Sequence, residues 1–288
     1  MNKIIVTMSI SLVTNIFLSL IKIVSGILCN SGALIADGIH SFSDLVTDLV
    51  AIIGDKISRK PADYKHPFGH GKLEYLTSFF IGVIILVLGL SIISNSFKKE
   101  IVIPSIAVAI VSFFTIVIKF LLATFLISKG KKYNNNILVA SGKESSTDVL
   151  SSVVVLLSAL ISQFSNQISA FKYADLVATI IVGIFIVRVG FEIVRDNISI
   201  LIGECETNEE FIENLTNVIL KNKSIIKVDS INLIKYGSYY KLNCEVSLDG
   251  KLSFKVAHNI VHILEDSITN NIPEIKYITI HANPYDIV

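Results

Sequence analysis

The sequence predicts an α-helical membrane protein in which a six-helix transmembrane bundle precedes a small α+β domain. The first observation is composition: 52% of the 288 residues are hydrophobic and only 17% are charged, whereas soluble proteins carry about a quarter charged residues. The second is a change after about Asp196, where charges return and no apolar run is long enough to span a bilayer. We therefore expect a transmembrane domain over residues 1–200 and a cytoplasmic αββαβ domain over residues 201–288.

Six apolar stretches are long enough to cross a membrane, because a spanning helix needs about 20 apolar residues. They run approximately from Ile4 to Leu28, Gly32 to Ile53, Leu76 to Ile93, Ile103 to Leu126, Ile137 to Ile161 and Leu176 to Ile193. The second and fifth are the least apolar. The first is too long for a signal peptide and lacks a small-residue cleavage site, so no signal peptide is expected.

The distribution of basic residues predicts the orientation of these spans. The loops after the second and fourth spans carry Lys56, Arg59, Lys60, Lys65, Lys72, Lys129, Lys131 and Lys132. The loops on the opposite side carry only Lys98, Lys99 and Lys172. We therefore expect both termini in the cytoplasm. The lack of a targeting segment favours a bacterial inner membrane.

The tail alternates helical and strand-like patterns. Its expected elements are a helix over Asn208–Leu220 with Thr207 as N-cap, strands over Ile225–Ile234 and Tyr239–Leu248, a helix over Ser253–Ile268 and a strand over Ile275–His281. A Gly-Ser turn joins the first two strands. A domain of this size is near the lower limit for independent stability, so dimerisation would help it.

Polar residues recur at helical spacing inside two predicted spans. They are Asp37, His40, Asp44 and Asp48 in the second span, and Ser141, Glu144, Asp148 and Ser151 in the fifth. Spacings of three and four residues place each set on one helix face, because each residue turns a helix by about 100°. Charged groups at membrane depth are costly, so both faces are candidates for a functional site.

Two pairs within these faces favour a metal site. His40 lies one turn before Asp44, and Glu144 lies one turn before Asp148. Two facing helices would then offer one imidazole and three carboxylates, a set that suits a first-row divalent cation. The alternative is a polar contact between helices, or side chains that reach water from the span ends. The pairing in two separate spans favours the metal.

The remaining ionisable residues in the spans are expected to be anchors. Lys22 near the outer end of the first span and Lys119 near the inner end of the fourth are expected to extend their ammonium groups to an interface. Asp175 and Arg188, near the ends of the sixth span, have the same expected role. Asn15 is compatible with an interhelical hydrogen bond.

The loop after the second span holds another set of donors, namely Asp63, His66 and His70. Two histidines four residues apart beside an aspartate can form a three-ligand metal site. The alternative is a solvated loop with incidental histidines. Spacing alone slightly favours the solvated loop.

Composition also excludes several classes of protein. A net charge of +1 argues against a nucleic-acid partner, which requires a concentrated basic surface. The three cysteines are far apart, with no CxxC, so neither a disulfide framework nor a thiolate zinc site is indicated. The HExxH motif of a metalloprotease is absent, and we do not expect an enzyme.

Two segments together resemble the cation diffusion facilitator family. They are Ser31-Gly-Ala-Leu-Ile-Ala-Asp-Gly-Ile-His-Ser-Phe-Ser-Asp44 and His66-Pro-Phe-Gly-His-Gly-Lys-Leu-Glu74. The resemblance implies a homodimer in the lipid bilayer that exports divalent cations, such as zinc, iron or manganese, in exchange for protons. The cation is then the substrate, and no prosthetic group is expected. The tail is expected to be a metallochaperone-like domain that binds metal at the dimer interface.

The resemblance also implies particular ligands. The matching positions of the transport site are His40, Asp44, Glu144 and Asp148, those of the loop site are Asp63, His66 and His70, and those of the tail are His258 and His281. Glu144 stands where the family has His or Asp, and the resulting oxygen-rich set admits Mn²⁺ or Fe²⁺ beside Zn²⁺. Other tail ligand positions hold Ile231, Asn243 and Asn283. In the family, the lysine at the position of Lys72 forms a salt bridge with an acid at the start of the tail. The position that matches this acid here holds Gly203, and Glu204 is adjacent.

The expected function is therefore proton-coupled export of divalent cations from the cytoplasm. Metal ligands must be deprotonated, so metal and protons compete for the site. The alternative is a membrane subunit that senses metal or acts as a scaffold without transporting it. Metal-dependent proton flux distinguishes the two.

Overall fold

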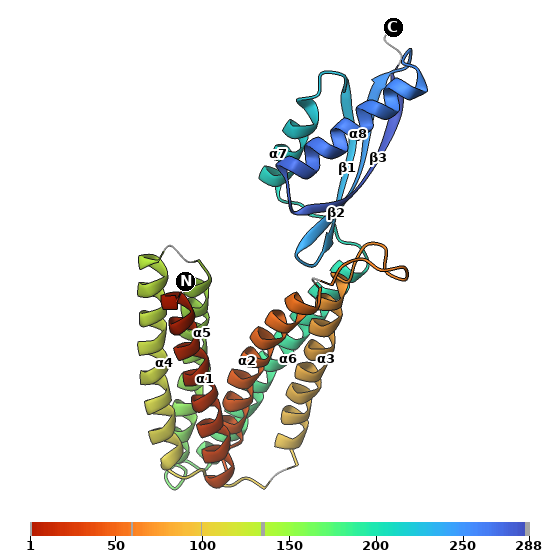
Figure 1. Ribbon diagram of the computed structural model, residues 1–288. Helices are drawn as coiled ribbons and strands as arrows, with labels where there is room; N and C mark the ends of the chain where they lie inside the picture. Colours follow the sequence, from red (N-terminus) through yellow and green to blue (C-terminus); the bar gives the residue numbers. More distant parts are fainter. Residues whose placement is uncertain (1, 59, 99, 134–135, 286–288) are drawn as a thin grey trace. The chain divides into compact units, whose positions relative to one another are not determined.

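The computed structural model describes residues 2–58, 60–98, 100–133 and 136–285 (Figure 1). The side chains of residues 2–5, 47–58, 136–137 and 140 lie outside this description, and the predicted polar residue Asp48 is among them. The long helices are α1 (Asn2–Leu28), α2 (Gly32–Ser58), α3 (Lys72–Ser96), α4 (Ala107–Lys132), α5 (Asn136–Ser162) and α6 (Ala174–Leu201). A short 3₁₀ helix, η1 (Ser169–Tyr173), precedes α6.

The fold class predicted from the sequence is confirmed. Among the described residues, five helical segments are long and apolar enough to cross a membrane: Val6–Leu28, Lys72–Ser96, Ala107–Lys132, Ser141–Ser162 and Ser169–Leu201. Helix α2 supplies the remaining long helix, and its side chains are described only over residues 32–46. The chain is therefore an integral multi-pass membrane protein.

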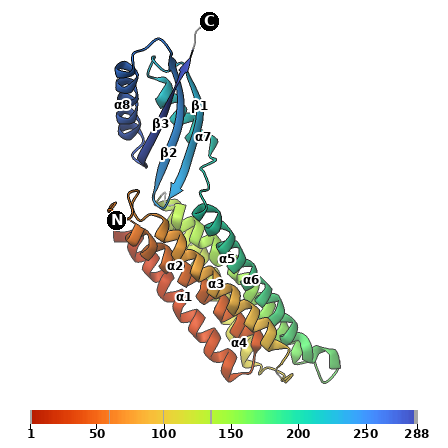
Figure 2. The same ribbon diagram turned by 90° about the vertical axis from the view of Figure 1, so that its right-hand side faces the viewer.

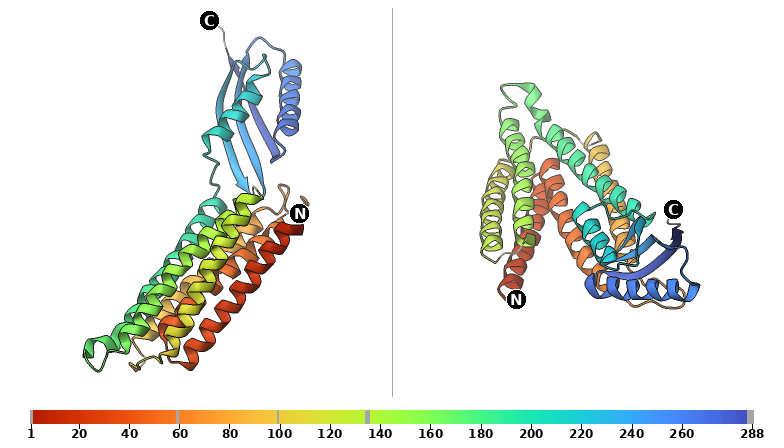
Figure 3. Two further views of the ribbon diagram at one scale, coloured as in Figure 1. Left: turned by 90° about the vertical axis from the view of Figure 1, so that its left-hand side faces the viewer. Right: turned by 90° about the horizontal axis from the view of Figure 1, so that it is seen from above.

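The chain divides into two compact units, which we describe separately. The first contains residues Met1–Leu49 and Phe80–Ile193, and the second contains Val50–Phe79 and Val194–Val288. In the first unit, α1, α4 and α5 lie to one side, and α2, α3 and α6 to the other (Figures 1 and 3). The predicted boundary at residue 200 stays a prediction.

Close backbone approach and polar caps hold the helices of the first unit together. A Cβ on Gly38 would lie 2.9 Å from the Ile23 nitrogen, so only glycine lets α2 pass α1 at this distance. At the start of α2, the Asp175 carboxylate on α6 accepts hydrogen bonds from the Ser31 hydroxyl at 2.6 Å and the Gly32 amide at 2.9 Å. The prediction that Asp175 is an interfacial anchor is wrong, because it is buried and satisfies the amide at this helix N-terminus.

The tail of the second unit has the predicted αββαβ order. Its elements are α7 (Glu209–Leu220), β1 (Lys227–Tyr236), β2 (Tyr239–Asp249), α8 (Phe254–Asn271) and β3 (Ile275–Tyr285). The sheet order is β1-β2-β3, with β1 antiparallel and β3 parallel to β2 (Figure 2). The predicted N-cap Thr207 is wrong by one residue, because the Asn208 side chain accepts the Phe211 amide at 3.0 Å.

Alternation along β2 determines where the tail core lies. Leu242, Cys244, Val246 and Leu248 are all buried and share one face of the strand. Leu215 from α7 and Leu264 from α8 belong to the same hydrophobic cluster. Both helices therefore pack against this face of the sheet, and burial raises the pKa of the Cys244 thiol to about 11.

The loop before α3 packs on the turn between β1 and β2, all within the second unit. The Tyr239 hydroxyl donates to the Phe68 carbonyl at 2.8 Å and accepts from the Gly71 amide at 3.1 Å. The Tyr75 hydroxyl likewise bonds both backbone groups of Gly237, which has a φ of +70° that favours glycine. A Cβ on Gly71 would collide with the carbonyl of Tyr236, so this contact also requires glycine.

Replacing Leu242 by alanine should destabilise the tail by about 2–5 kcal/mol, because it leaves a cavity under the central strand. Hydrogen–deuterium exchange of the sheet amides in the full-length protein measures the loss. Leu220→Ala is the matched control, since Leu220 is 45% exposed. Equal amide protection in the Leu242→Ala variant and the wild type would contradict the core described here.

Candidate metal centres

Helices α2 and α5 bring together three of the four predicted intramembrane ligands. Candidate donor atoms of His40, Asp44 and Asp148 all lie within 4.8 Å of one another. His40 and Asp44 come from successive turns of α2, and Asp148 comes from α5. Because a helix rises about 1.5 Å per residue, His40 lies roughly 12 Å into α2. One imidazole and two carboxylates therefore converge well inside the bundle.

The imidazole at this centre has an unused ring nitrogen. His40 Nδ1 is buried and has no hydrogen-bond partner among the described residues. A buried polar atom without a partner costs free energy, so such atoms are uncommon in folded proteins. A divalent cation would use the lone pair of an imidazole nitrogen and the negative charge of the two carboxylates. The donor set therefore fits a bound cation.

The fourth predicted ligand, Glu144, is not part of this group. It lies on α5 one turn before Asp148, and its side chain is exposed. Four residues turn an α-helix by about 400°, so Glu144 is displaced by roughly 40° from the direction of Asp148. Its role as a ligand stays a prediction.

Lys119 contradicts the expectation that it reaches a membrane interface. Its side chain is 2% exposed, and its ammonium group donates to the Asp148 carboxylate. A lysine ammonium group buried in a bundle requires an acidic partner, because an unpaired charge there is strongly destabilising. This ion pair joins α4 to α5, so residue spacing within a single helix could not predict it.

Lys22 is buried in the same way, but in a denser network. Its ammonium group lies 2.8 Å from Asp37 and donates to the hydroxyls of Ser152 at 2.8 Å and Ser41 at 3.2 Å. Asp37 also accepts from Ser151 at 2.6 Å and from Ser152 at 2.8 Å. The interfacial role predicted for Lys22 is therefore wrong. Instead, this network joins α1, α2 and α5 beside the candidate centre.

The loop before α3 forms a second group from all three of its predicted donors. Candidate ligand atoms of Asp63, His66 and His70 lie within 4.8 Å of one another. Asp63 approaches His66 Nδ1 at 3.0 Å and His70 Nε2 at 3.3 Å, and the two rings are 4.4 Å apart. The His66 backbone amide donates to Asp63 and holds the pKa of that carboxyl below its usual value. The site is thus assembled, although each ligand role stays a prediction.

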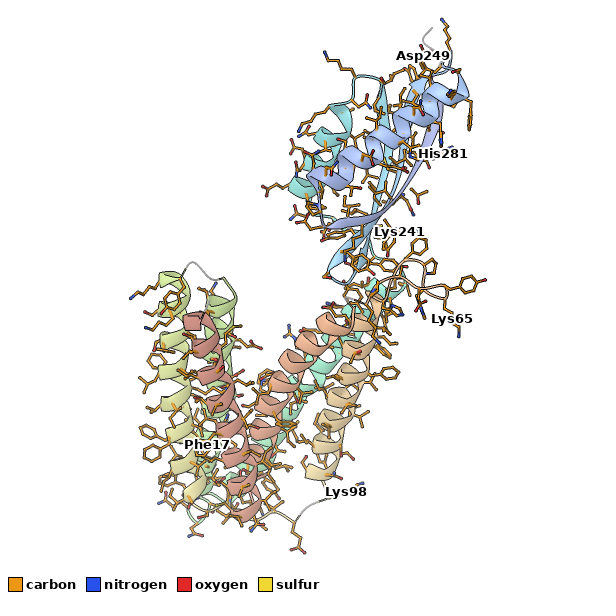
Figure 4. All side chains as sticks on the ribbon, viewed as in Figure 1. Phe17, Lys65, Lys98, Lys241, Asp249 and His281 are labelled. Carbon is orange, nitrogen blue, oxygen red and sulfur yellow. The ribbon has the colours of Figure 1, made fainter. Side chains whose placement is uncertain are left out.

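Aromatic packing holds this loop in place. Phe68, between the two histidines, meets the Tyr277 ring edge-on at 5.6 Å, and the Lys241 ammonium group lies 3.7 Å from its centroid. Figure 4 labels Lys65 on the loop and Lys241 near the start of β2. The loop donors are therefore supported by the tail.

Lys72 bonds the backbone rather than an acid. Its ammonium group donates to the Leu201 carbonyl at 3.0 Å, where a cation is favourable because it lies at the C-terminal end of α6. Glu204 pairs instead with Lys235 at 2.8 Å, which keeps the pKa of Glu204 below its usual value. Glu204, the acid next to the expected salt-bridge position, therefore pairs with Lys235 and not with Lys72.

The two predicted tail ligands do not join a three-donor group among the described residues. His258 on α8 packs beside His262, with ring centroids 4.6 Å apart. His281 is exposed on β3 (Figure 4). Asn283, at another family ligand position, bonds Glu245 at 3.2 Å. Metal binding by His258 and His281 stays a prediction.

The described helices define a multi-pass membrane protein that gathers an imidazole and two carboxylates between two of its helices. Residues 8–202 match the model of the cation efflux transmembrane domain, and residues 207–285 match that of the cation efflux protein cytoplasmic domain. The chain belongs to the cation efflux, or cation diffusion facilitator, family.

Several relatives match nearly the whole chain. The manganese efflux system protein MneP of Bacillus subtilis is 30% identical over 281 residues, covering 96% of this chain and 94% of its own. The uncharacterized transporter MJ0449 of Methanocaldococcus jannaschii is 35% identical over 255 residues, covering 87% and 88%. The cadmium, cobalt and zinc/H⁺–K⁺ antiporter of Bacillus subtilis is 26% identical, covering 93% and 85%.

Replacing His70 by alanine should weaken divalent-cation binding at the loop by more than about tenfold, because loss of even a supporting partner of a ligand costs about 10–100-fold. Titration of the full-length protein with Zn²⁺, followed through the imidazole NMR signals, measures the change. Tyr64→Ala is the control, since Tyr64 lies fully exposed in the same loop. Unchanged Zn²⁺ binding in His70→Ala would exclude His70 as a ligand.

Proposed function

We propose that this protein exports a divalent metal cation from the cytoplasm in exchange for protons. The convergence of His40, Asp44 and Asp148 from two helices carries the proposal, because buried ionisable residues in a membrane bundle are expected on ion pathways. Membership of the cation efflux family supports it. The names of two relatives, a manganese efflux protein and a metal antiporter, support it further.

Manganese is the cation that we propose first. Carboxylate oxygens suit Mn²⁺, whereas sites specific for softer metals favour thiolates. The group on α2 and α5 has two carboxylates, one imidazole and no cysteine. Fe²⁺ and Zn²⁺ suit the same donors, and water or Glu144 can complete the coordination. The manganese efflux relative, which aligns over 96% of this chain, supports this order of preference.

Competition between metal and protons provides the proposed coupling. Carboxylates and imidazole bind metal only when deprotonated, so protons that arrive from outside favour release of the cation. We propose that His40 takes part in this exchange, because a neutral imidazole nitrogen can bind a metal ion and a protonated one cannot. An inward proton gradient would therefore drive the metal outward.

The surrounding assembly is part of the same proposal. We propose a homodimer in a bacterial inner membrane with both termini in the cytoplasm. The basic residues in the last turn of α4 and in the loop between α2 and α3 support this orientation. The loop site of Asp63, His66 and His70 would then meet cytoplasmic metal.

Asp148→Asn should abolish Mn²⁺-dependent proton flux in proteoliposomes, because it removes a charged ligand from the buried centre. Asp44→Asn should do the same. Glu144→Gln is the matched comparison on α5, and it should reduce flux less than either Asp variant, because Glu144 lies outside the observed group and water can take its place on the metal. Undiminished flux in either Asp variant would contradict the assigned site.

The same experiment separates transport from metal sensing. A sensor or scaffold subunit would bind Mn²⁺ at His40, Asp44 and Asp148 yet move neither metal nor protons. A passive channel would move Mn²⁺ without coupled proton movement. Each outcome is distinguished by recording internal Mn²⁺ and internal pH in the same vesicles.

A further inference from the structure

Lys119 places an ammonium group against one of the acids of the intramembrane centre. It comes from α4, which supplies none of the predicted ligands, and its ammonium group contacts the carboxylate of Asp148. Asp148 is one of the three groups whose ligand atoms converge. We propose that Lys119 is a tethered cation, which neutralises Asp148 when metal is absent and is displaced when metal binds. This inference rests on the proposed function.

Displacement follows from the chemistry of the shared carboxylate. The oxygen that accepts an ammonium hydrogen bond offers a lone pair that a metal ion would also use. Two carboxylates and one ammonium group together carry a single net negative charge. A dication that entered without moving Lys119 would lie next to a like charge, which is strongly unfavourable at low dielectric. Metal binding therefore requires the ammonium group to leave.

The ammonium group of Lys119 is held by fewer hydrogen bonds than that of Lys22. An ammonium group has three hydrogen-bond donors. Lys22 directs its donors to three acceptors, namely Asp37, Ser41 and Ser152. Lys119, within the described part of the chain, has Asp148 as its hydrogen-bond acceptor and no other. A metal that takes Asp148 removes one bond from Lys119, whereas displacing Lys22 would break three.

The proposed role of Lys119 is to limit affinity so that the cation can leave. A site with two carboxylates and no competing charge would retain a dication in the low dielectric of the bundle. A lysine that returns to Asp148 as the metal departs replaces part of the lost positive charge. Lys119 is thus a positioning residue that acts through Asp148, not a ligand.

Lys119→Gln tests the proposal in the full-length protein. Mn²⁺ affinity, measured by competition with a chelating dye at mildly alkaline pH, should rise by about tenfold or more, because the competing charge is gone. Mn²⁺ release in stopped-flow chase experiments should slow by a similar factor. Lys119→Arg should keep affinity close to that of the wild type, because it keeps the charge. Unchanged affinity and release in Lys119→Gln would overturn the tethered cation.

Two controls separate this inference from the proposed function. Lys22→Gln removes an equally buried ammonium group whose acid lies outside the ligand group, and it should not tighten Mn²⁺ binding. Asp148→Asn tests the site itself. If Asp148→Asn leaves binding intact, the proposed transport site fails. If Asp148→Asn weakens binding but Lys119→Gln leaves it unchanged, only the role of Lys119 fails.

A measurement on the wild-type protein tests the proposal even if the Lys119→Gln variant fails to fold. The side-chain ¹⁵N NMR signal of Lys119, assigned with the Lys119→Arg variant, reports the environment of its ammonium group. Zn²⁺, which is diamagnetic, should shift this signal as the site fills and leave that of Lys22 in place. A Lys119 signal that stays constant while Zn²⁺ binds to the centre would contradict displacement.

Discussion

The cost of an unpaired charge at membrane depth is the constraint on which the rest of the structure depends. The first unit meets it by pairing the two buried lysines among its described residues with aspartates on neighbouring helices, Lys22 with Asp37 and Lys119 with Asp148. The partners come from four different helices, so the ion pairs also join the bundle. Hydrophobic packing against lipid supplies no comparable specificity between helices. The polar residues thus position the helices that carry the candidate ligands.

The two ion pairs are similar in burial but differ in what surrounds them. Asp37 accepts hydrogen bonds from two serines as well as from Lys22, which leaves little capacity for a metal. Asp148 shares its carboxylate between Lys119 and the convergence point of His40 and Asp44. One network therefore holds the helices, and the other leaves an exchangeable position. Both networks pair a buried lysine with an aspartate, but they differ in the number of hydrogen-bond acceptors around the lysine.

Sequence spacing could predict the fold class and most of the candidate donors, because helical periodicity is local. It predicted that His40 and Asp44 share a face, and the observed group with Asp148 agrees with that geometry. Spacing could not predict the pairing of Lys119, which depends on how α4 faces α5. It also grouped Glu144 with Asp148, although the observed rotation of α5 leaves Glu144 exposed. Which direction a helix face points is a property of packing, not of spacing.

The loop centre extends the same reasoning to a solvent-exposed site. Its donors are close in sequence, so spacing could name Asp63, His66 and His70 as candidates, although spacing alone slightly favoured a solvated loop. A short exposed loop has many conformations, and ordering it costs free energy. Phe68 offsets that cost by packing on Tyr277, and Tyr239 bonds the backbone on both sides of Gly69. The tail therefore supports this candidate metal centre without supplying one of its three donors, and the spacing of the donors does not reveal this contribution of the aromatic residues.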